Sequence, residues 1–363
     1  MPPLVRRVVY VVVALVAICG ILGWRFLAAA GTFTGIRAEV PADCRSIASV
    51  PGPEDIQIDR ARGQAFVSAL DWRAVVAGKS GVRGGIYVID LKAPQADWAL
   101  RPVTANEPAD FKPHGLSLYV GADGKRRLFV VNHAASGEAV EIFDVAEDGL
   151  LTHVKTVSDP LLISPNDVVA VGPDAFYATN DHTSTGVWAK ISDFLLLRNA
   201  DVVYYDGASM KVAAKLLLFP NGINVSADGR SLYVGETLGA ALHVYTRDPA
   251  TGVLTPRDYT KLGTGLDNID VEPDGSLLIA ADPHMMAFIK HAKDPAALSP
   301  SQVVRIEPAA SGMGGKAGTI YLNSGAEISA ASVAAGYDDV MLIGNVFSPK
   351  ILVCKQSREF KSF

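Results

Sequence analysis

A pair of residues, polar or polar with glycine, recurs along the chain, each time directly before a short apolar segment. The pairs are Glu54-Asp55, His114-Gly115, Asn166-Asp167, Asn221-Gly222 and Asp267-Asn268, and a weaker sixth unit extends from about Glu327 to Gly344. Successive units lie about 50 residues apart, which is the period of a propeller blade of roughly four strands. The repeat therefore predicts a ring of six blades.

The segments within each repeat are typical of strands rather than helices. Apolar and polar residues alternate over short stretches, and turn signals such as Asp123-Gly124 and Asp274-Gly275 separate them. The clearest helical candidate is residues 188–197. No Pro- or Ser-rich linker divides residues 45–354. We therefore expect an all-β fold, a six-bladed β-propeller, as one domain over residues 32–363.

The N-terminus differs in kind from the rest of the chain. Arg6 and Arg7 precede an uncharged stretch, residues 8–24, that is about long enough to cross a membrane. A cleaved signal peptide and a retained signal anchor both fit this pattern, since the alanines that follow suit signal peptidase. Because Arg25 lies before those alanines, we favour a retained hydrophobic anchor helix within residues 1–31. Either way, the propeller is expected to be exported, to the periplasm or the extracellular space.

Two of the cysteines frame the exported part. Cys44 lies at its beginning and Cys354 near its end, whereas Cys19 lies in the apolar stretch. In an oxidising compartment such a pair can form a disulfide that joins the first strand to the last and closes a circular fold. Two unpaired buried thiols are the alternative.

The charge of the chain argues against nucleic acid as a partner. The 33 Lys and Arg residues are outnumbered by 38 Asp and Glu residues, whereas phosphate binding needs a dense basic face. The one tight basic run, Lys125-Arg126-Arg127, is predicted to be a solvated hairpin turn.

The polar pairs point to one site, because the innermost strands of all blades line the central channel of a propeller. The oxygen-bearing residues expected there are Glu54, Asp55, Asn166, Asp167, Asn221, Asp267 and Asn268. Hard oxygen donors without sulfur or imidazole suit calcium rather than zinc. Taken singly, each residue is explained as an ordinary turn or strand-start residue. A polar pair in most blades favours a metal site.

Two histidines lie near the predicted channel. His114 occupies the pair position of the second unit, and His133 follows the next strand. Since consecutive strands of a blade lie side by side, the two imidazoles are expected within reach of each other. A histidine near neutrality can take a proton from water. The pair is a candidate catalytic base, with His182 as a further candidate, whereas a lone histidine is usually structural.

Other catalytic and nucleotide-binding signatures do not occur in the sequence. There is no Gly-x-Ser-x-Gly elbow, no P-loop and no Rossmann fingerprint. The glycine-rich segment 312–316 lacks the P-loop spacing and is predicted to be a loop.

Several motifs together resemble the paraoxonase family of calcium-dependent lactonases and arylesterases. They lie between Cys44 and Cys354 and are Pro53-Glu-Asp-Ile, Phe111-Lys-Pro-His-Gly-Leu-Ser, Val130-Val-Asn-His, Pro165-Asn-Asp-Val-Val-Ala-Val-Gly-Pro, Tyr177-Ala-Thr-Asn-Asp-His, Asn221-Gly-Ile-Asn-Val-Ser, Asp267-Asn-Ile and Ile343-Gly-Asn-Val-Phe. The resemblance implies a propeller that holds a catalytic and a structural calcium ion in its channel. It also implies that the hydrophobic N-terminus is retained and associates with a membrane.

The resemblance further implies roles for individual residues. The ligands of the catalytic calcium would be Glu54, Asn166, Asn221, Asp267 and Asn268, and those of the structural calcium Asp55, Asp167 and the backbone carbonyl of Leu116. His114 and His133 would form a histidine dyad. Phe219 and Val346 would line the substrate pocket, and Cys44 and Cys354 would form the closing disulfide.

These implications describe a carboxylic ester hydrolase that opens small-molecule lactones first and aryl esters second, by water attack on a carbonyl polarised by calcium. A non-catalytic binding propeller outside the cell, or an enzyme similar to gluconolactonase or strictosidine synthase, is the alternative. Three departures from the family pattern leave substrate preference open: Ala281-Asp282 in place of Cys-His, the segment with Trp72 and Arg73, and residues 183–201.

Overall fold

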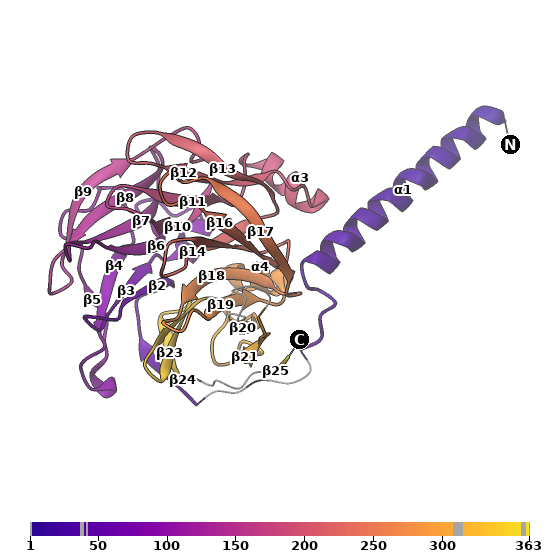
Figure 1. The fold of residues 1–363 in the computed structure, drawn as a ribbon. Coiled ribbons are helices and arrows are strands. Elements are labelled where there is room, and N and C mark those ends of the chain that lie inside the picture. The colour runs from indigo at the N-terminus through magenta and orange to yellow at the C-terminus, as the bar shows by residue number, and fades with distance from the viewer. Residues whose placement is uncertain (1, 37–39, 41–42, 308–314, 357–360, 363) are drawn as a thin grey trace.

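The computed structural model describes residues 2–36, 40, 43–307, 315–356 and 361–362 (Figure 1). In this part of the chain the strands form six antiparallel sheets, each of them one blade. Blade 1 contains β2 (Pro53–Asp59), β3 (Gln64–Ala69), β4 (Gly85–Asp90) and β5 (Arg101–Pro102). Blade 2 contains β6 (Pro113–Val120), β7 (Arg126–Ala134), β8 (Gly137–Val145) and β9 (Leu151–Val157). Blade 3 contains β10 (Pro165–Ala170), β11 (Phe176–Asn180), β12 (Ala200–Tyr205) and β13 (Met210–Leu217).

The second half of the chain repeats this plan. Blade 4 contains β14 (Pro220–Val225), β15 (Ser231–Glu236), β16 (Ala241–Arg247) and β17 (Leu254–Lys261). Blade 5 contains β18 (Gly265–Val271), β19 (Leu277–Asp282), β20 (Ser301–Ile306), β21 (Ala317–Asn323) and the short β25 (Lys361–Ser362). Blade 6 contains β22 (Ala331–Tyr337), β23 (Val340–Asn345), β24 (Lys350–Lys355) and, from the start of the domain, β1 (Cys44–Ala48).

The innermost strands close a ring. β2, β6, β10, β14, β18 and β22 contact one another in this order, and β22 also contacts β2. This order confirms the predicted six-bladed propeller. The apolar cores lie between neighbouring blades, as where Phe129 of blade 2 packs against Phe176 of blade 3. Because blades cover both faces of each other, several strands are buried along their whole length, β10 and β23 among them.

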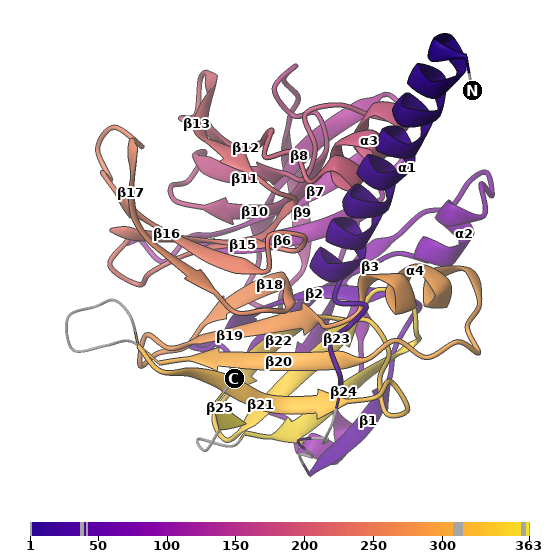
Figure 2. The same ribbon diagram turned by 90° about the vertical axis from the view of Figure 1, so that its right-hand side faces the viewer.

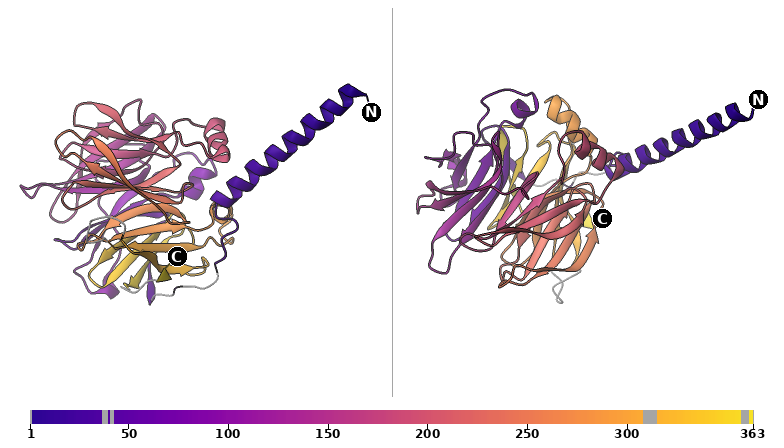
Figure 3. Two further views of the ribbon diagram at one scale, coloured as in Figure 1. Left: turned by 45° about the vertical axis from the view of Figure 1, so that its right-hand side comes forward. Right: turned by 90° about the horizontal axis from the view of Figure 1, so that it is seen from above.

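The helices lie outside the ring. They are α1 (Pro3–Ala29), α2 (Trp72–Val76), the 3₁₀ helix η1 (Gln95–Asp97), α3 (Val187–Leu195) and α4 (Met285–Lys293). The helix expected at residues 188–197 corresponds to α3. The first helix, α1, projects away from the blades (Figure 3), and α2, α3 and α4 lie at the end of the propeller to which it is joined (Figure 2).

Residues 8–24 of α1 carry no charge, and none of the residues of α1 is buried. The mean hydropathy of its most apolar window is 2.3. By length and composition such a helix is able to cross a membrane, although a signal sequence meets the same criteria.

The N-terminal strand completes the last blade. β1 pairs with β24, Cys44 lies opposite Cys354, and these two cysteines form a disulfide. The predicted closing disulfide is confirmed, and the alternative of two free thiols is excluded. The covalent bond therefore joins the two ends of the ring at one blade.

Removing this disulfide is expected to lower the free energy of unfolding by about 3–5 kcal/mol. The bond spans a sequence separation of 310 residues, and a cross-link over so long a loop removes much conformational entropy from the unfolded chain. Urea unfolding of the Cys44→Ser/Cys354→Ser double variant measures the loss. Cys19→Ser is the matched control, because Cys19 is an exposed free thiol in α1. An unchanged unfolding midpoint in the double variant would contradict this prediction.

The prediction that the basic run Lys125-Arg126-Arg127 is a solvated turn was wrong for Arg126. The side chain of Arg126 is buried, and its guanidinium lies 2.7 Å from the Asp59 carboxylate. The reason is that this ion pair links β7 to β2 across two blades. Most of the glycine-rich segment 312–316 lies outside the described residues.

Candidate active site

The polar pairs lie where each innermost strand enters its sheet. In every blade the pairing of this strand with its neighbour shifts register here, for example between Pro53 and Asp55 and between Leu266 and Ile269. Such a bulge leaves residues unpaired and redirects their side chains. Glu54 and both members of the pairs in blades 2 to 5 are therefore bulged positions, whereas Asp55 already pairs with Ser68. Ser332, which the sequence analysis did not single out, occupies the bulge of blade 6.

Residues from five of these bulges line a single cavity of about 250 Å³. Its polar wall consists of Glu54, His114, Asn166, Asn221, Thr237, Asp267 and Asp282. Its apolar wall consists of Trp72, Val76, Phe219, Met285, Phe288, Ala292, Val346 and Phe347. The two residues expected to contact substrate, Phe219 and Val346, thus lie in the same cavity as His114 and four of the five expected ligands of the catalytic calcium, whereas Asn268 and the expected ligands of the structural calcium do not line it. A small cavity with an apolar wall and a few polar groups is typical of a small-molecule site.

Four oxygen atoms of the expected ligands of the catalytic calcium are buried without a hydrogen-bond partner among the described residues. They are Glu54 Oε2, Asn166 Oδ1, Asn221 Oδ1 and Asn268 Oδ1. A buried acceptor without a donor is costly, so these atoms mark a place for a positively charged group that the chain does not supply. Carboxylate and amide oxygens are the ligands that a hard cation such as calcium prefers, and the donor set fits that ion.

This donor set depends on amides more than on charged groups. Within the described ranges, no three His, Cys, Asp or Glu side chains are arranged to hold a metal ion. Hydrogen bonds nevertheless orient the ligands. Asn268 Nδ2 donates to Glu54 Oε1 at 3.0 Å, which leaves Asn268 Oδ1 as the free acceptor. The Ser332 hydroxyl donates to the Glu54 backbone carbonyl at 2.6 Å and holds the strand in place.

Asp55 and Asp167, the expected ligands of the structural calcium, are bonded to backbone amides of neighbouring blades. The Asp55 carboxylate accepts from Leu116 N–H at 2.7 Å, and the Asp167 carboxylate accepts from Ile223 N–H at 2.8 Å. Each carboxylate thereby joins two innermost strands. Leu116 makes this contact through its amide, whereas the resemblance assigns a role to its carbonyl.

The glycine in two of the pairs has a steric cause. A Cβ atom at Gly115 would lie 2.4 Å from Asp167 Oδ1, and one at Gly222 would lie 2.4 Å from the Asp267 backbone carbonyl. A side chain at either position would push the innermost strands apart. Glycine therefore lets neighbouring blades approach closely at the level of the site.

The buried carboxyl groups of the site have too few positive charges and hydrogen-bond donors around them to stabilise their ionised forms. Burial, followed by the charge of Glu54, raises the pKa of Asp55 to about 8. Burial and then the charge of Asp55 raise the pKa of Asp167 well above its usual range, and burial and then the charge of Glu54 do the same for Asp267. A cation bound among these groups would lower all three pKa values and favour the ionised forms.

His114 and His133 belong to a hydrogen-bonded chain that ends on a carboxylate. His114 Nδ1 lies 2.9 Å from His133 Nε2, and His133 Nδ1 lies 2.7 Å from Glu138 Oε2. An ionised Glu138 only accepts, so His133 Nδ1 donates to it, and neutral His133 accepts from His114 Nδ1–H. His114 Nε2 then carries the free lone pair, in the wall of the cavity and 3.6 Å from Glu54 Oε1.

The environment of His114 favours its protonated form. Burial lowers the pKa of this imidazole, but the charge and hydrogen bond of Glu54, and then the charges of Asp181 and Asp55, outweigh burial and raise the pKa above its ordinary value. A proton accepted by His114 is therefore stabilised by the carboxylates around it.

Glu138 and Trp72 are site residues that the sequence analysis did not assign. The tight β7–β8 hairpin places Glu138 directly opposite His133, so the spacing of the hairpin was a signal for it. The Trp72 ring lies over both imidazoles, with centroid distances of 4.8 Å to His114 and 5.6 Å to His133. The sequence of α2 alone held no sign that it folds over the dyad.

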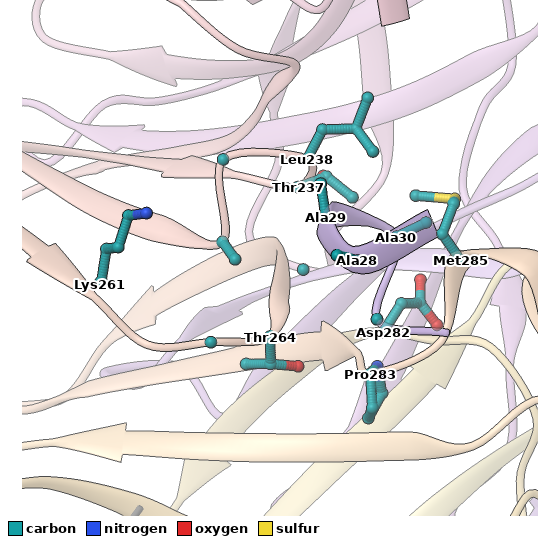
Figure 4. A pocket seen from close by; sticks show the side chains of 15 residues that line it. Ala28, Ala29, Ala30, Thr237, Leu238, Lys261, Thr264, Asp282, Pro283 and Met285 are labelled. Atoms are coloured by element: carbon teal, nitrogen blue, oxygen red, sulfur yellow. The ribbon is translucent and has the colours of Figure 1, made fainter. Parts of the chain in front are cut away.

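Asp282 is a further carboxylate of the cavity wall and stands at one of the departures from the family pattern. It is the last residue of β19, and burial raises its pKa to about 8. It also borders a second cavity, of about 230 Å³, at the C-terminal end of α1 (Figure 4). Asp282, Thr237 and Met285 line both spaces.

His182, the further candidate base, does not line the cavity, although its ring packs against Phe219. It lies between two carboxylates, 2.8 Å from Asp181 and 2.9 Å from Asp193. Burial lowers its pKa, but the hydrogen bonds to both carboxylates dominate and raise the pKa to about 10. An imidazole that stays protonated is a poor base near neutrality, and this one connects the end of β11 to α3.

Comparison with known proteins identifies the family. The model of the arylesterase family matches residues 41–356, nearly the whole propeller. The chain belongs to the arylesterase family. Serum paraoxonase/arylesterase 2 of Rattus norvegicus is 36% identical over 345 residues, which cover 92% of this chain and 96% of that protein. Serum paraoxonase/lactonase 3 of Mus musculus is 34% identical over 327 residues, which cover 88% and 90%. The resemblance to the paraoxonases is confirmed.

Among solved structures, a luciferin-regenerating enzyme has the same fold, with a TM-score of 0.54 and 11% sequence identity over 89% of this chain and 98% of that one. At this identity the likeness concerns the fold alone. Membership of the arylesterase family supports an ester hydrolase with small-molecule substrates. The exposed apolar helix and the disulfide fit a secreted or anchored family member.

Proposed function

We propose that this family member is a calcium-dependent hydrolase of lactones and aryl esters. The observation that carries the proposal is one cavity in which buried oxygens without partners lie beside a histidine dyad and an apolar wall. Water attack on an ester carbonyl requires a base, a positive charge near the carbonyl oxygen and a place for the acyl or ring carbons. The relatives named for arylesterase and lactonase activity support the same reaction class.

The resemblance to the paraoxonases assigns the residues that would hold the two ions. The catalytic calcium would be held by Glu54, Asn166, Asn221, Asp267 and Asn268, and the structural calcium by Asp55, Asp167 and the Leu116 carbonyl. The catalytic calcium would supply the positive charge that polarises the carbonyl. The amide ligands offer oxygens without adding negative charge, and the hydrogen bonds of Asn268 and Ser332 keep the ligands in position.

The dyad moves the proton. His114 Nε2 faces the cavity with its lone pair and takes a proton from the attacking water. Its Nδ1–H is already directed at His133 Nε2, 2.9 Å away, so the positive charge can pass to His133, where Glu138 stabilises it. In the collapse of the tetrahedral intermediate His114 returns a proton to the leaving oxygen, and a lactone opens to a hydroxy acid.

The apolar wall binds the carbon skeleton and limits access of water. Phe219 and Val346 contribute to this wall from loops of the propeller, and Trp72 of α2 and Phe288 of α4 contribute to it from helices. Burial of these groups against a lactone ring or an aryl group favours uncharged substrates. Exclusion of water also strengthens the electrostatic interactions at the carbonyl.

The placement of the enzyme follows from its N-terminal helix. We assign residues 1–31 to a retained membrane anchor and residues 32–363 to the hydrolase domain, which lies outside the cytoplasm in the periplasm or the extracellular space. The arginines that precede the apolar stretch favour a cytoplasmic N-terminus, and a disulfide is stable in an oxidising compartment.

An assay of the full chain with and without calcium tests the proposal. With calcium, δ-valerolactone and phenyl acetate are expected to be hydrolysed, and EDTA is expected to reduce both rates to the uncatalysed level until calcium is restored. Calcium is also expected to raise the melting temperature, because it binds only the folded site. Full activity after complete calcium removal would refute the calcium dependence. No hydrolysis by the calcium-loaded protein would favour a non-catalytic binding propeller.

A further inference from the structure

Asp282 is a carboxylate without a partner in the wall of the active-site cavity. Its exposed fraction is 5%, and its Oδ1 atom has no hydrogen-bond partner among the residues that the structure describes. It is not one of the bulged residues and not one of the expected calcium ligands. It ends β19, where the paraoxonase pattern has Cys-His and this chain has Ala281-Asp282.

Three residues that share the cavity wall with Asp282 do not donate a hydrogen bond to its Oδ1 atom. Met285 and Phe288, which share the cavity wall with it, have no polar hydrogen. The nearby Thr237 hydroxyl is already used, because it donates to the Leu266 carbonyl at 2.7 Å. Asp282 and Asp267 line the same cavity, where burial, then the charge of Glu54 and then the charge of Asp282 raise the pKa of Asp267. A buried acceptor with apolar and like-charged neighbours is costly unless a donor reaches it.

Because Asp282 lines the cavity, a bound ligand can donate the hydrogen bond that its Oδ1 atom lacks. Asp267 belongs to the group of oxygens around which the carbonyl is polarised, and Asp282 lies next to it in the same wall. A group on the substrate that reaches Asp282 is therefore close to the reacting carbonyl. An oxygen acceptor is present at this position whether the carboxyl is ionised or neutral.

We propose that Asp282 determines substrate specificity by accepting a hydrogen bond from an O–H or N–H group next to the carbonyl that is hydrolysed. The proposal rests on the proposed function and narrows its substrate class to lactones and esters with a donor at the α position. A site built around a buried polar group discriminates strongly against analogues that leave this group unpaired.

The test compares two lactones that differ in one hydrogen-bond donor, α-hydroxy-γ-butyrolactone and α-methoxy-γ-butyrolactone. The readout is the ratio of their kcat/KM values, measured with calcium for the wild-type chain and for the Asp282→Leu and Asp282→Asn variants. The hydroxy/methoxy ratio is expected to fall at least about ten-fold in Asp282→Leu, because the hydrogen bond from the hydroxyl to a buried acceptor is lost. Asp282→Asn retains a neutral oxygen acceptor, so its hydroxy/methoxy ratio is expected to lie between those of the wild type and Asp282→Leu.

Asp201→Asn is the matched control. Asp201 is also a buried aspartate, but it accepts from Asn180 Nδ2 at 2.8 Å on the outer part of blade 3 and does not line the cavity. Its substitution is expected to leave the ratio unchanged. An unchanged ratio in a folded Asp282→Leu variant would overturn the proposal. An equal loss for both lactones would also overturn it and would assign Asp282 to the metal site.

The binding of compounds that cannot be hydrolysed tests the role of Asp282 independently of the proposed hydrolase activity. The ketones 2-hydroxycyclopentanone and 2-methoxycyclopentanone have the same shape as the lactones but no ester bond, and NMR titration measures their affinities without hydrolysis. If the chain hydrolyses neither lactone, the hydrolase proposal fails, while a preference for the hydroxyketone that Asp282→Asn weakens still supports the role of Asp282. Equal affinities for both ketones in the wild type would overturn it.

Discussion

Asp267→Ala is expected to lower kcat/KM for lactone hydrolysis about a thousand-fold or more. Asp267 contributes a buried carboxylate to the cavity from the bulge of blade 5, beside Glu54. Without it the site retains mainly amide oxygens, and a hard divalent cation binds such a set weakly. Steady-state kinetics at saturating calcium measure the loss. Activity within ten-fold of wild type would show that Asp267 is not a ligand that the reaction needs.

Asp267→Ala is expected to affect calcium binding but not the stability of the calcium-free fold. In the absence of calcium the Asp267 carboxylate is buried and repelled by Glu54 and Asp282, so its removal should not lower the melting temperature. The increase in melting temperature on adding calcium should be lost. Asp270→Ala is the matched control from the same strand. It breaks the pair with Arg60 at 2.9 Å and costs stability, but it should leave the calcium effect intact.

His114→Gln is expected to lower kcat about a hundred- to ten-thousand-fold, the usual contribution of a general base. Glutamine retains a hydrogen-bonding side chain of similar reach but cannot take a proton from water. His153→Gln is the control, because His153 also pairs with a buried carboxylate, Glu141 at 2.8 Å, yet lies on the outer strand β9. A loss in His153→Gln as large as that in His114→Gln would mean that the effect is structural.

The relay from His114 is tested through Glu138. Glu138→Gln removes the charge that stabilises protonated His133, so the pKa of the dyad is expected to fall. Activity needs the unprotonated base and is lost as the pH falls through this pKa. The acidic limb of the pH–rate profile should therefore move to lower pH, with a smaller loss of kcat than in His114→Gln. A limb that does not move would remove Glu138 from the relay.

The sequence carried the architecture of this propeller because the architecture repeats. Blades 1 to 5 begin with a similar local pattern, a polar pair or a polar residue with glycine before an apolar strand, and the pattern recurs at the period of a blade. The ring, the closing disulfide between Cys44 and Cys354 and the family were therefore predicted and are confirmed. The set of residues brought to one cavity, from Glu54 to Asp267, also follows from equivalent positions in a ring.

The roles of single side chains depended on which blade or helix packs beside them. Arg126 belongs to a basic run that is typical of a surface turn, but it is buried against Asp59. Trp72 contacts the histidines only because tertiary packing places α2 beside them. The lack of a partner for Asp282 is likewise a property of its surroundings. Local sequence determines strands and turns through interactions within a few residues. Burial and hydrogen-bond partners are set by segments far apart in the chain, so they were decided only when the ring closed.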